Sequence, residues 1–139
     1  MSDSDITIIG GLTRDPELKF LNNGQAAVKF SVAVEKRWLN KATNEWDKKV
    51  SFFDVIQYGK PAENAAATLV KGSRVVVKGA LEQRSWETTE GEKKYVVEIN
   101  AEEVGLGLRF GTALYAKSDS AGSGATRAPA AATYAEEPF

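Results

Sequence analysis

Five segments rich in β-branched and aromatic residues, interrupted by one alanine-rich segment, set the strongest limit on the fold of this chain. The five segments span residues 5–13, 26–35, 50–58, 73–86 and 93–104. Several of them alternate apolar and polar residues with the period of two that is typical of strands. The alanine-rich segment has Pro61 in its first turn, an apolar stripe that ends at Leu69, and Gly72 just beyond, which predicts a helix. We therefore expect three strands, a helix and then two strands.

This order predicts an all-β fold class and favours an OB-fold, a five-stranded Greek-key barrel with one helix between strands 3 and 4. On periodicity alone, an SH3-like barrel and a β-sandwich are the alternatives. Gly79 lies in the middle of a long predicted strand and indicates a bulge or sharp bend there. Tight turns are predicted at residues 22–24 and 90–92, and a longer loop at 40–47.

The chain divides into a barrel domain and a tail of different composition. We assign residues 1–105 to the barrel, and residues 106–117 to a sixth strand or an extension. Residues 118–135 are rich in alanine, serine and glycine, which predicts a flexible linker. The chain then ends in Glu136, Glu137, Pro138 and Phe139. A terminal phenylalanine has no core of its own in such a tail, so this ending is either incidental or suited to the surface of another protein.

Composition excludes several classes of function. The 139 residues contain no cysteine and no histidine, which removes disulfides, thiolate and imidazole metal sites and histidine-based acid–base chemistry. Gly59 and Lys60 are followed by Pro61, which does not fit a phosphate-binding P-loop. The acids are scattered and do not resemble a magnesium site. We therefore expect no enzyme, no catalytic residues, no cofactor and no metal.

No targeting or membrane segment is expected either. No apolar run approaches the roughly 18–20 residues that a membrane span needs. The first residues, Met-Ser-Asp-Ser-Asp, are acidic and do not fit the start of a secretory signal. We expect a cytoplasmic protein that has no membrane partner.

Net charge alone does not indicate a nucleic-acid binder. The whole chain has 18 basic and 19 acidic residues, a net charge of −1. Residues 1–117 carry 17 basic and 16 acidic side chains, so their net charge is +1. Any prediction of nucleic-acid binding must therefore rest on where the basic groups lie.

Aromatic and basic residues occur together in three segments. Phe52 and Tyr58 are six apart, so they share a strand face. Trp38 and Trp46 flank the predicted loop at 40–47, where the nearby basic residues are Lys36, Arg37, Lys41, Lys48 and Lys49. On the strand 73–86, one face carries Arg74, Lys78, Glu82, Arg84 and Trp86, provided that Gly79 does not shift the register.

This combination suits a single-stranded nucleic acid, because aromatic rings stack on its bases while basic groups hold its phosphates. An aromatic residue on a strand is more often part of a core, and basic residues on the outside of a strand are usually only solvated. Phe53 adjoins Phe52, and only one of the two can face inward. Their occurrence together in three segments nevertheless favours a nucleic-acid-binding face.

Several stretches resemble the bacterial single-stranded DNA-binding protein family, and the resemblance covers residues 5–110 and the last few residues. The matching stretches are GGLTRDPELKF with NG after it (10–24), FSVAVEKRW (30–38), KATNEW (41–46), FFDVIQYGKPAENAA (52–66), LVKGSRVVVKGALEQRSWE (69–87) and VEINAEEVG (97–105). The stretch VGLGLRFGTALYAK resembles an extra C-terminal strand of the high-GC Gram-positive subgroup, where it clamps neighbouring subunits.

The resemblance implies an OB-fold that assembles as a homotetramer and binds single-stranded DNA during replication, recombination and repair. It implies base stacking by Trp38, Phe52, Tyr58 and Trp86. It also implies backbone contacts by Lys60, Lys71, Arg74 and Arg84, to which we add Lys36, Arg37 and Lys78 from their placement as phosphate contacts. In this family, an acidic tip that ends in Pro-Phe docks on replication and repair proteins, a role that would fall to residues 136–139.

Two departures from the family pattern concern the predicted binding face. Phe52 occupies a position where many relatives have tryptophan. Asp54 shares the face of Phe52 and Tyr58, where a basic residue would be expected, so it should either repel phosphate or pair with a neighbour. The alternative functions are an OB-fold module that binds RNA or a protein, and a small phosphodiesterase.

Overall fold

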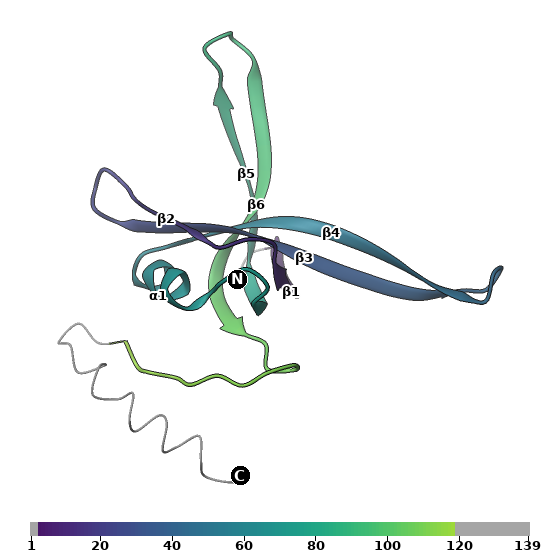
Figure 1. The fold of residues 1–139 in the computed structure, drawn as a ribbon. Helices are drawn as coiled ribbons and strands as arrows, with labels where there is room; N and C mark the ends of the chain where they lie inside the picture. The colour runs from purple at the N-terminus through teal and green to yellow at the C-terminus, as the bar shows by residue number, and fades with distance from the viewer. Residues whose placement is uncertain (1–2, 119–139) are drawn as a thin grey trace. The chain divides into compact units, whose positions relative to one another are not determined.

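The computed structural model describes residues 3–118. Its six strands and one helix, shown in Figure 1, are β1 (Asp5–Leu12), β2 (Glu17–Phe20), β3 (Ala26–Asn40), β4 (Glu45–Tyr58), α1 (Lys60–Thr68), β5 (Arg74–Glu87) and β6 (Lys93–Leu106). The strands form one sheet in the order β1-β5-β6-β4-β3-β2.

The barrel is closed by β1, which pairs with a different strand at each of its edges. Along one edge it pairs with β5, from Asp5 opposite Ala80 to Gly11 opposite Arg74. At its end it also pairs with β3, where Leu12 lies opposite Val32. The ring β1-β5-β6-β4-β3 is therefore complete, with a short parallel pairing between β4 and β6. A closed five-stranded barrel with one helix is the arrangement of an OB-fold, so the predicted fold class is confirmed.

Two glycines allow strands to approach one another closely at the corners of the barrel. A Cβ atom on Gly10 would lie 2.2 Å from the backbone oxygen of Ala33, and one on Gly79 would lie 2.2 Å from that of Asn100. The ladder between β5 and β6 shifts register between Lys78 and Gly79, so the predicted irregularity is confirmed. The extra residue is Glu102 on β6, and the alternation of β5 is therefore maintained across Gly79.

Alternating residues of the strands fill the barrel. The buried core includes Val28, Phe30, Val32, Val55, Val75, Val77 and Ile99. Helix α1 follows β4 and buries Ala62 and Ala65, and Leu69 is buried just after the helix ends. Gly72 then adopts a positive φ of 89° in the turn that leads to β5. The predicted helix and its apolar stripe are thus observed.

The structure differs from the prediction in the length of its strands. β3 continues to Asn40 and β4 begins at Glu45. The expected loop at 40–47 is therefore a turn of only four residues, 41–44. Strand β2 was not predicted, because its four residues are all exposed and, within the described part of the chain, it pairs only with β3.

β6 ends at Leu106, and residues 107–118 contain no strand in the single chain, so the assignment of residues 106–117 to a sixth strand or an extension stays a prediction. Residues 108–118 belong to a separate unit, in which the guanidinium group of Arg109 lies 5.6 Å from the ring centroid of Phe110. Apart from residue 118, the predicted linker at 118–135 lies outside the described residues, as does the tip at 136–139. Within residues 3–118, no helix is long and apolar enough to span a membrane.

Replacing Gly79 with alanine should lower the free energy of unfolding by about 1–3 kcal/mol, the usual cost of overpacking. The new Cβ atom would press on the backbone of β6. Gly105→Ala is a matched control on β6, because a Cβ there would meet nothing within 4 Å. Urea unfolding at a fixed protein concentration measures both effects. Equal stability of the two variants would contradict the close approach of the strands.

Candidate nucleic-acid interface

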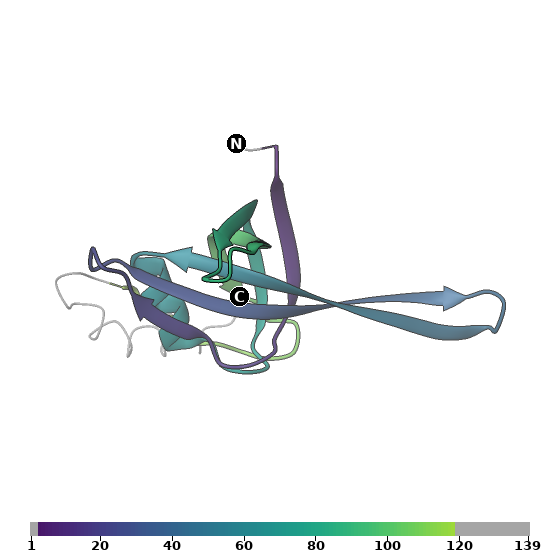
Figure 2. The same cartoon turned by 90° about the horizontal axis from the view of Figure 1, so that it is seen from above.

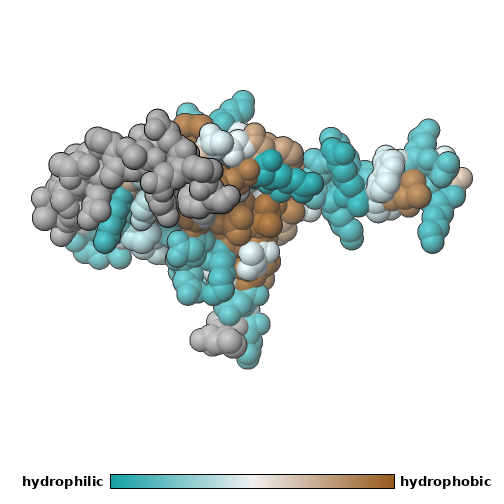
Figure 3. All heavy atoms as spheres, turned by 90° about the horizontal axis from the view of Figure 1, so that it is seen from below, coloured by the Kyte–Doolittle hydropathy of each residue, from teal (hydrophilic) through white to brown (hydrophobic). Residues whose placement is uncertain are grey.

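Two hairpins extend beyond the barrel and carry many of the aromatic and basic side chains of interest. We call them the β3–β4 arm (residues 34–51) and the β5–β6 arm (residues 83–97). Figures 1 and 2 show them projecting from the barrel in different directions. A two-stranded ribbon outside the barrel has no second layer, so most of its side chains reach solvent. Figure 3 shows mostly hydrophilic side chains along the β3–β4 arm, with a few pale and hydrophobic ones among them.

The register of the strands defines one continuous outer face. Ile56 of β4 lies opposite Asn100 of β6, and Asn100 lies opposite Ala80 of β5. Residues that are opposite in a ladder project to the same side of the sheet. The even-numbered residues of β4, of β5 and of β6 up to Asn100 therefore share one side, and the core residues Val55 and Ile99 point to the other. We call the first side the outer face.

Phe52 and Tyr58 both lie on this outer face, as their spacing predicted. They are 66% and 38% exposed, while the neighbouring Phe53 packs against the core. Asp54 lies between them and is half-buried. Among the described residues no salt bridge involves Asp54. Pairing with a basic neighbour, one of the two expectations for this carboxylate, is therefore not observed among the described residues. The other expectation stays a prediction: the charge of Asp54 would repel a nearby phosphate.

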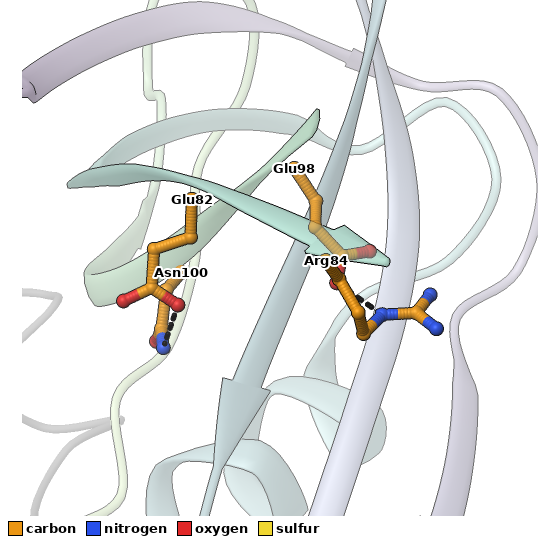
Figure 4. Close-up of polar contacts among 4 residues, drawn as sticks. All are labelled: Glu82, Arg84, Glu98 and Asn100. Carbon is orange, nitrogen blue, oxygen red and sulfur yellow. Dashed lines mark hydrogen bonds and ion pairs between the residues drawn. The ribbon is translucent and has the colours of Figure 1, made fainter. Parts of the chain in front are cut away.

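Trp86 and Arg84 lie on the same outer face, on the β5–β6 arm. The guanidinium carbon of Arg84 lies 5.0 Å from the ring centroid of Trp86, within the range of a cation–π interaction. Its Nε donates a hydrogen bond of 3.0 Å to Oε1 of Glu98 on β6. Figure 4 shows the two terminal nitrogens of Arg84 pointing away from this carboxylate. Arg84 is therefore anchored through Nε, and its other donors face outward.

Glu98 is a residue of the candidate site that the sequence did not reveal. It is only 5% exposed, and its Oε2 has no hydrogen-bond partner within the described chain. A buried carboxylate is costly unless a cation compensates it. Glu82 lies directly opposite Glu98 and instead accepts a hydrogen bond of 3.2 Å from Asn100, which Figure 4 also shows. The partner of Arg84 depends on the register between β5 and β6, which composition and spacing do not provide.

Trp38 does not share the face of the other predicted stacking residues. It lies opposite Asp47, whereas Phe52 lies opposite Ala33, and position 47 has the parity of the core-facing residues of β4. The side chain of Trp38 therefore projects from the reverse side of the β3–β4 arm. The structure brings Phe52, Tyr58 and Trp86 to one sheet face and places Trp38 on the opposite side of its ribbon.

Basic residues stand directly opposite one another on both faces of the β3–β4 arm. Lys36 faces Lys49 on the same side as Trp38, and Arg37 faces Lys48 on the outer face. Like charges in opposite positions destabilise a two-stranded ribbon. The stability of the fold therefore gives no reason for these basic pairs. Arg37 also forms a salt bridge with Glu35, and this hydrogen bond lowers the pKa of the Glu35 carboxyl group.

The remaining predicted phosphate contacts are spread over the barrel. Arg74 and Lys78 share the outer side of β5, and Lys78 forms a salt bridge of 3.1 Å with Glu102. Lys60 is exposed at the start of α1. Lys71 is exposed in the turn before β5, where its backbone N–H donates to Asp15. No group of three or more acidic side chains within residues 3–118 is placed to hold a metal ion.

The chain is similar to proteins of one family over most of its length. The model of the "Single-strand binding protein family" matches residues 3–106. A "Single-stranded DNA-binding protein" of Mycobacterium tuberculosis is 44% identical over 132 residues, which cover 92% of this chain and 80% of the relative. The "Single-stranded DNA-binding protein 2" of Streptomyces coelicolor is 43% identical over 120 residues, which cover 86% of this chain and 60% of the relative.

A solved structure is also similar. The crystal structure of a small single-stranded DNA-binding protein from Streptomyces coelicolor matches with a TM-score of 0.64 and 30% sequence identity. The match covers 80% of this chain and the whole of that one. The family match and the mycobacterial and streptomycete relatives confirm the resemblance found in the sequence.

Arg84→Ala should lower the free energy of unfolding by about 1–3 kcal/mol, because it leaves the buried Glu98 carboxylate without a cation. Adding Glu98→Gln should restore much of this loss, since a neutral amide costs less to bury than a charge. The control is Arg37→Ala, whose exposed partner Glu35 keeps its contact with water. Urea unfolding of the three variants checks the account, and a double variant no more stable than Arg84→Ala would contradict it.

Proposed function

Because this chain belongs to the single-strand binding protein family, we propose that it binds single-stranded DNA without sequence preference and protects it. The observation that best supports this proposal is the outer face of the sheet. There, Phe52, Tyr58 and Trp86 are exposed, whereas Phe30 is buried inside the barrel. Arg84 lies over the ring of Trp86 on the same face. Members of this family are DNA-binding proteins and not enzymes.

Stacking and charge neutralisation would together hold the strand. A base stacked on an aromatic side chain contributes about 1–3 kcal/mol, a range that comes from single-strand-binding OB-folds themselves. Every base has an aromatic face, so such contacts do not discriminate between sequences. In a duplex these faces are covered by neighbouring bases, which explains a preference for the unpaired strand.

Arg84 is well placed to hold a phosphate next to a stacked base. Its Nε is occupied by Glu98, and its terminal nitrogens face outward, as Figure 4 shows. A planar guanidinium group with two free donors suits the paired oxygens of a phosphate. Glu98 thus fixes the direction in which Arg84 presents its remaining donors. The other proposed phosphate contacts are Lys36, Arg37, Lys60, Lys71, Arg74 and Lys78.

We further propose that the protein acts in the cytoplasm, at the nucleoid, in DNA replication, recombination and repair, as a homotetramer. Residues 106–117 would clamp neighbouring subunits, a role that rests on the resemblance of this segment to the extra C-terminal strand of the high-GC Gram-positive subgroup. The alternative to this proposal is an OB-fold module whose main ligand is RNA or a protein.

The C-terminal tip would recruit replication and repair proteins. Glu136 and Glu137 would steer the tail toward a basic surface, and Phe139 would fill an apolar pocket beside a group that binds its carboxylate. This proposal rests on the sequence of the tip and on its resemblance to the family, since residues 136–139 lie outside the described part of the chain.

Trp86→Ala and Trp38→Ala should each weaken binding of a labelled oligo-dT about tenfold, because each removes one base-stacking side chain. Both residues are exposed, so the free energy of unfolding should change little. Phe20→Ala is the matched control, since Phe20 is an exposed aromatic residue on β2, away from the outer face. Fluorescence anisotropy measures the affinities. Unchanged binding in both tryptophan variants would show that the stacking residues are wrongly assigned.

Deleting Pro138 and Phe139 should leave the affinity for oligo-dT nearly unchanged while abolishing capture of a replication or repair protein. Pull-down of a purified helicase or polymerase accessory protein with full-length and truncated chains measures the second effect. Equal capture by both chains would mean that the tip is not the docking element.

A further inference from the structure

Trp46 is a highly exposed aromatic residue that is not among the predicted stacking residues. It is 71% exposed, compared with 66% for Phe52 on the same strand. Trp46, Phe52 and Tyr58 are spaced six residues apart, so all three point to the outer side of β4. At about 3.3 Å per residue, consecutive members of this series are roughly 20 Å apart. β4 therefore carries a regular series of aromatic side chains from the barrel to the tip of the β3–β4 arm.

The direction of Trp46 is fixed by the ladder, because the residue lies in a strand and not in a loop. It is opposite Leu39, one pair before the last pair of the arm. The turn beyond is closed by a hydrogen bond of 2.7 Å from the N–H of Asn44 to the carbonyl oxygen of Asn40. The side chain of Asn40 accepts from the N–H of Ala42 and donates to Asp47. The tip is thus an ordered turn that keeps β4 regular through Trp46.

The surroundings of Trp46 match a single-stranded nucleic acid in charge as well as in shape. Next to the pair of Trp46 and Leu39, on the same face, Arg37 and Lys48 stand opposite one another. Residues 35–50 contain five basic and three acidic side chains, a net charge of +2 in a chain whose total is −1. A single exposed apolar residue is ordinary on a protein surface. An exposed tryptophan beside two opposed cations has the composition of a base-stacking and phosphate-binding platform.

We infer that Trp46 is a further base-stacking residue, and that the path of single-stranded DNA continues from Phe52 along the outer face of the β3–β4 arm to its tip. This inference rests on the proposed function and extends it. Arg37 and Lys48 lie between Trp46 and Phe52 along the ribbon and hold the phosphates of the intervening nucleotides. Trp38 projects from the reverse side of the same ribbon, so its contacts with DNA are separate from those of Trp46.

A single-tryptophan variant reports on Trp46 directly, since the chain has only three tryptophans. The double variant Trp38→Phe/Trp86→Phe retains Trp46 alone and keeps an aromatic ring at the other two positions. It is titrated with an oligo-dT several times longer than the site of one OB-fold, which is about 4–16 nucleotides. We expect its fluorescence to be quenched as the oligonucleotide binds. Anisotropy of a labelled oligonucleotide measures the extent of binding independently.

A second series tests the contribution to affinity in the otherwise unchanged chain. Trp46→Ala should weaken binding of the long oligo-dT about tenfold, the size expected for one stacked base. Trp46→Phe keeps a ring and should retain most of the affinity. Leu39→Ala is the matched control, because it removes the apolar cross-strand neighbour and leaves the ring in place.

The outcomes separate this inference from the proposed function. Quenching of Trp46 together with weaker binding by Trp46→Ala supports the extended path. Full binding by anisotropy with unquenched Trp46, or equal affinities of Trp46→Ala and Leu39→Ala, overturns it and leaves the proposed function intact. If the unchanged protein fails to bind oligo-dT by anisotropy, both the proposed function and the inference fail.

Discussion

The close approach of strands at two glycines is the constraint on which the rest of the structure depends. Gly10 lies against the backbone of Ala33 where β1 meets β3, and Gly79 lies against that of Asn100 where β5 bends across β6. With a side chain at either position, the backbones would have to separate and β1 could not bridge β5 and β3 in the same way. Closure of a small barrel requires such bends, which glycines and bulges provide.

Closure of the barrel also explains why the arms exist. β3, β4, β5 and β6 have 14 or 15 residues each, and the barrel uses only part of each strand. The remaining pairs continue as two-stranded ribbons whose side chains have no core to enter. Aromatic residues on these ribbons therefore stay exposed at a cost to stability, which is acceptable when a ligand covers them. The candidate interface is in this sense a consequence of strands that are longer than the barrel requires.

Sequence patterns predicted the fold class, the helix and the irregularity at Gly79, because each depends on local periodicity or on one residue type. They also predicted that Phe52 and Phe53 face opposite ways, since the alternation of a strand allows nothing else. They missed β2, whose four exposed residues carry no hydrophobic pattern, and they placed a loop where the β3–β4 arm continues. Polar and charged residues at 40–47 resemble a loop in composition, although they pair as strands at both ends.

The candidate site was less predictable than the fold, because it depends on register between distant segments. The anchoring of Arg84 by Glu98 and the opposite orientation of Trp38 and Phe52 both follow from which residues face one another across two strands. A single sequence gives the parity of each strand but not the alignment of one strand with the next. The positions of the cations on the β3–β4 arm, opposed in pairs, became evident only from that alignment.

The most direct test of the central claim is the tryptophan fluorescence of the unchanged protein during titration with single-stranded and duplex DNA at several salt concentrations. Stacking of unpaired bases on exposed tryptophans predicts strong quenching by the single strand and little by the duplex. Phosphate neutralisation predicts that binding of the single strand weakens as salt rises. An equal response to single-stranded and duplex DNA would contradict the claim that exposed aromatic side chains bind unpaired bases.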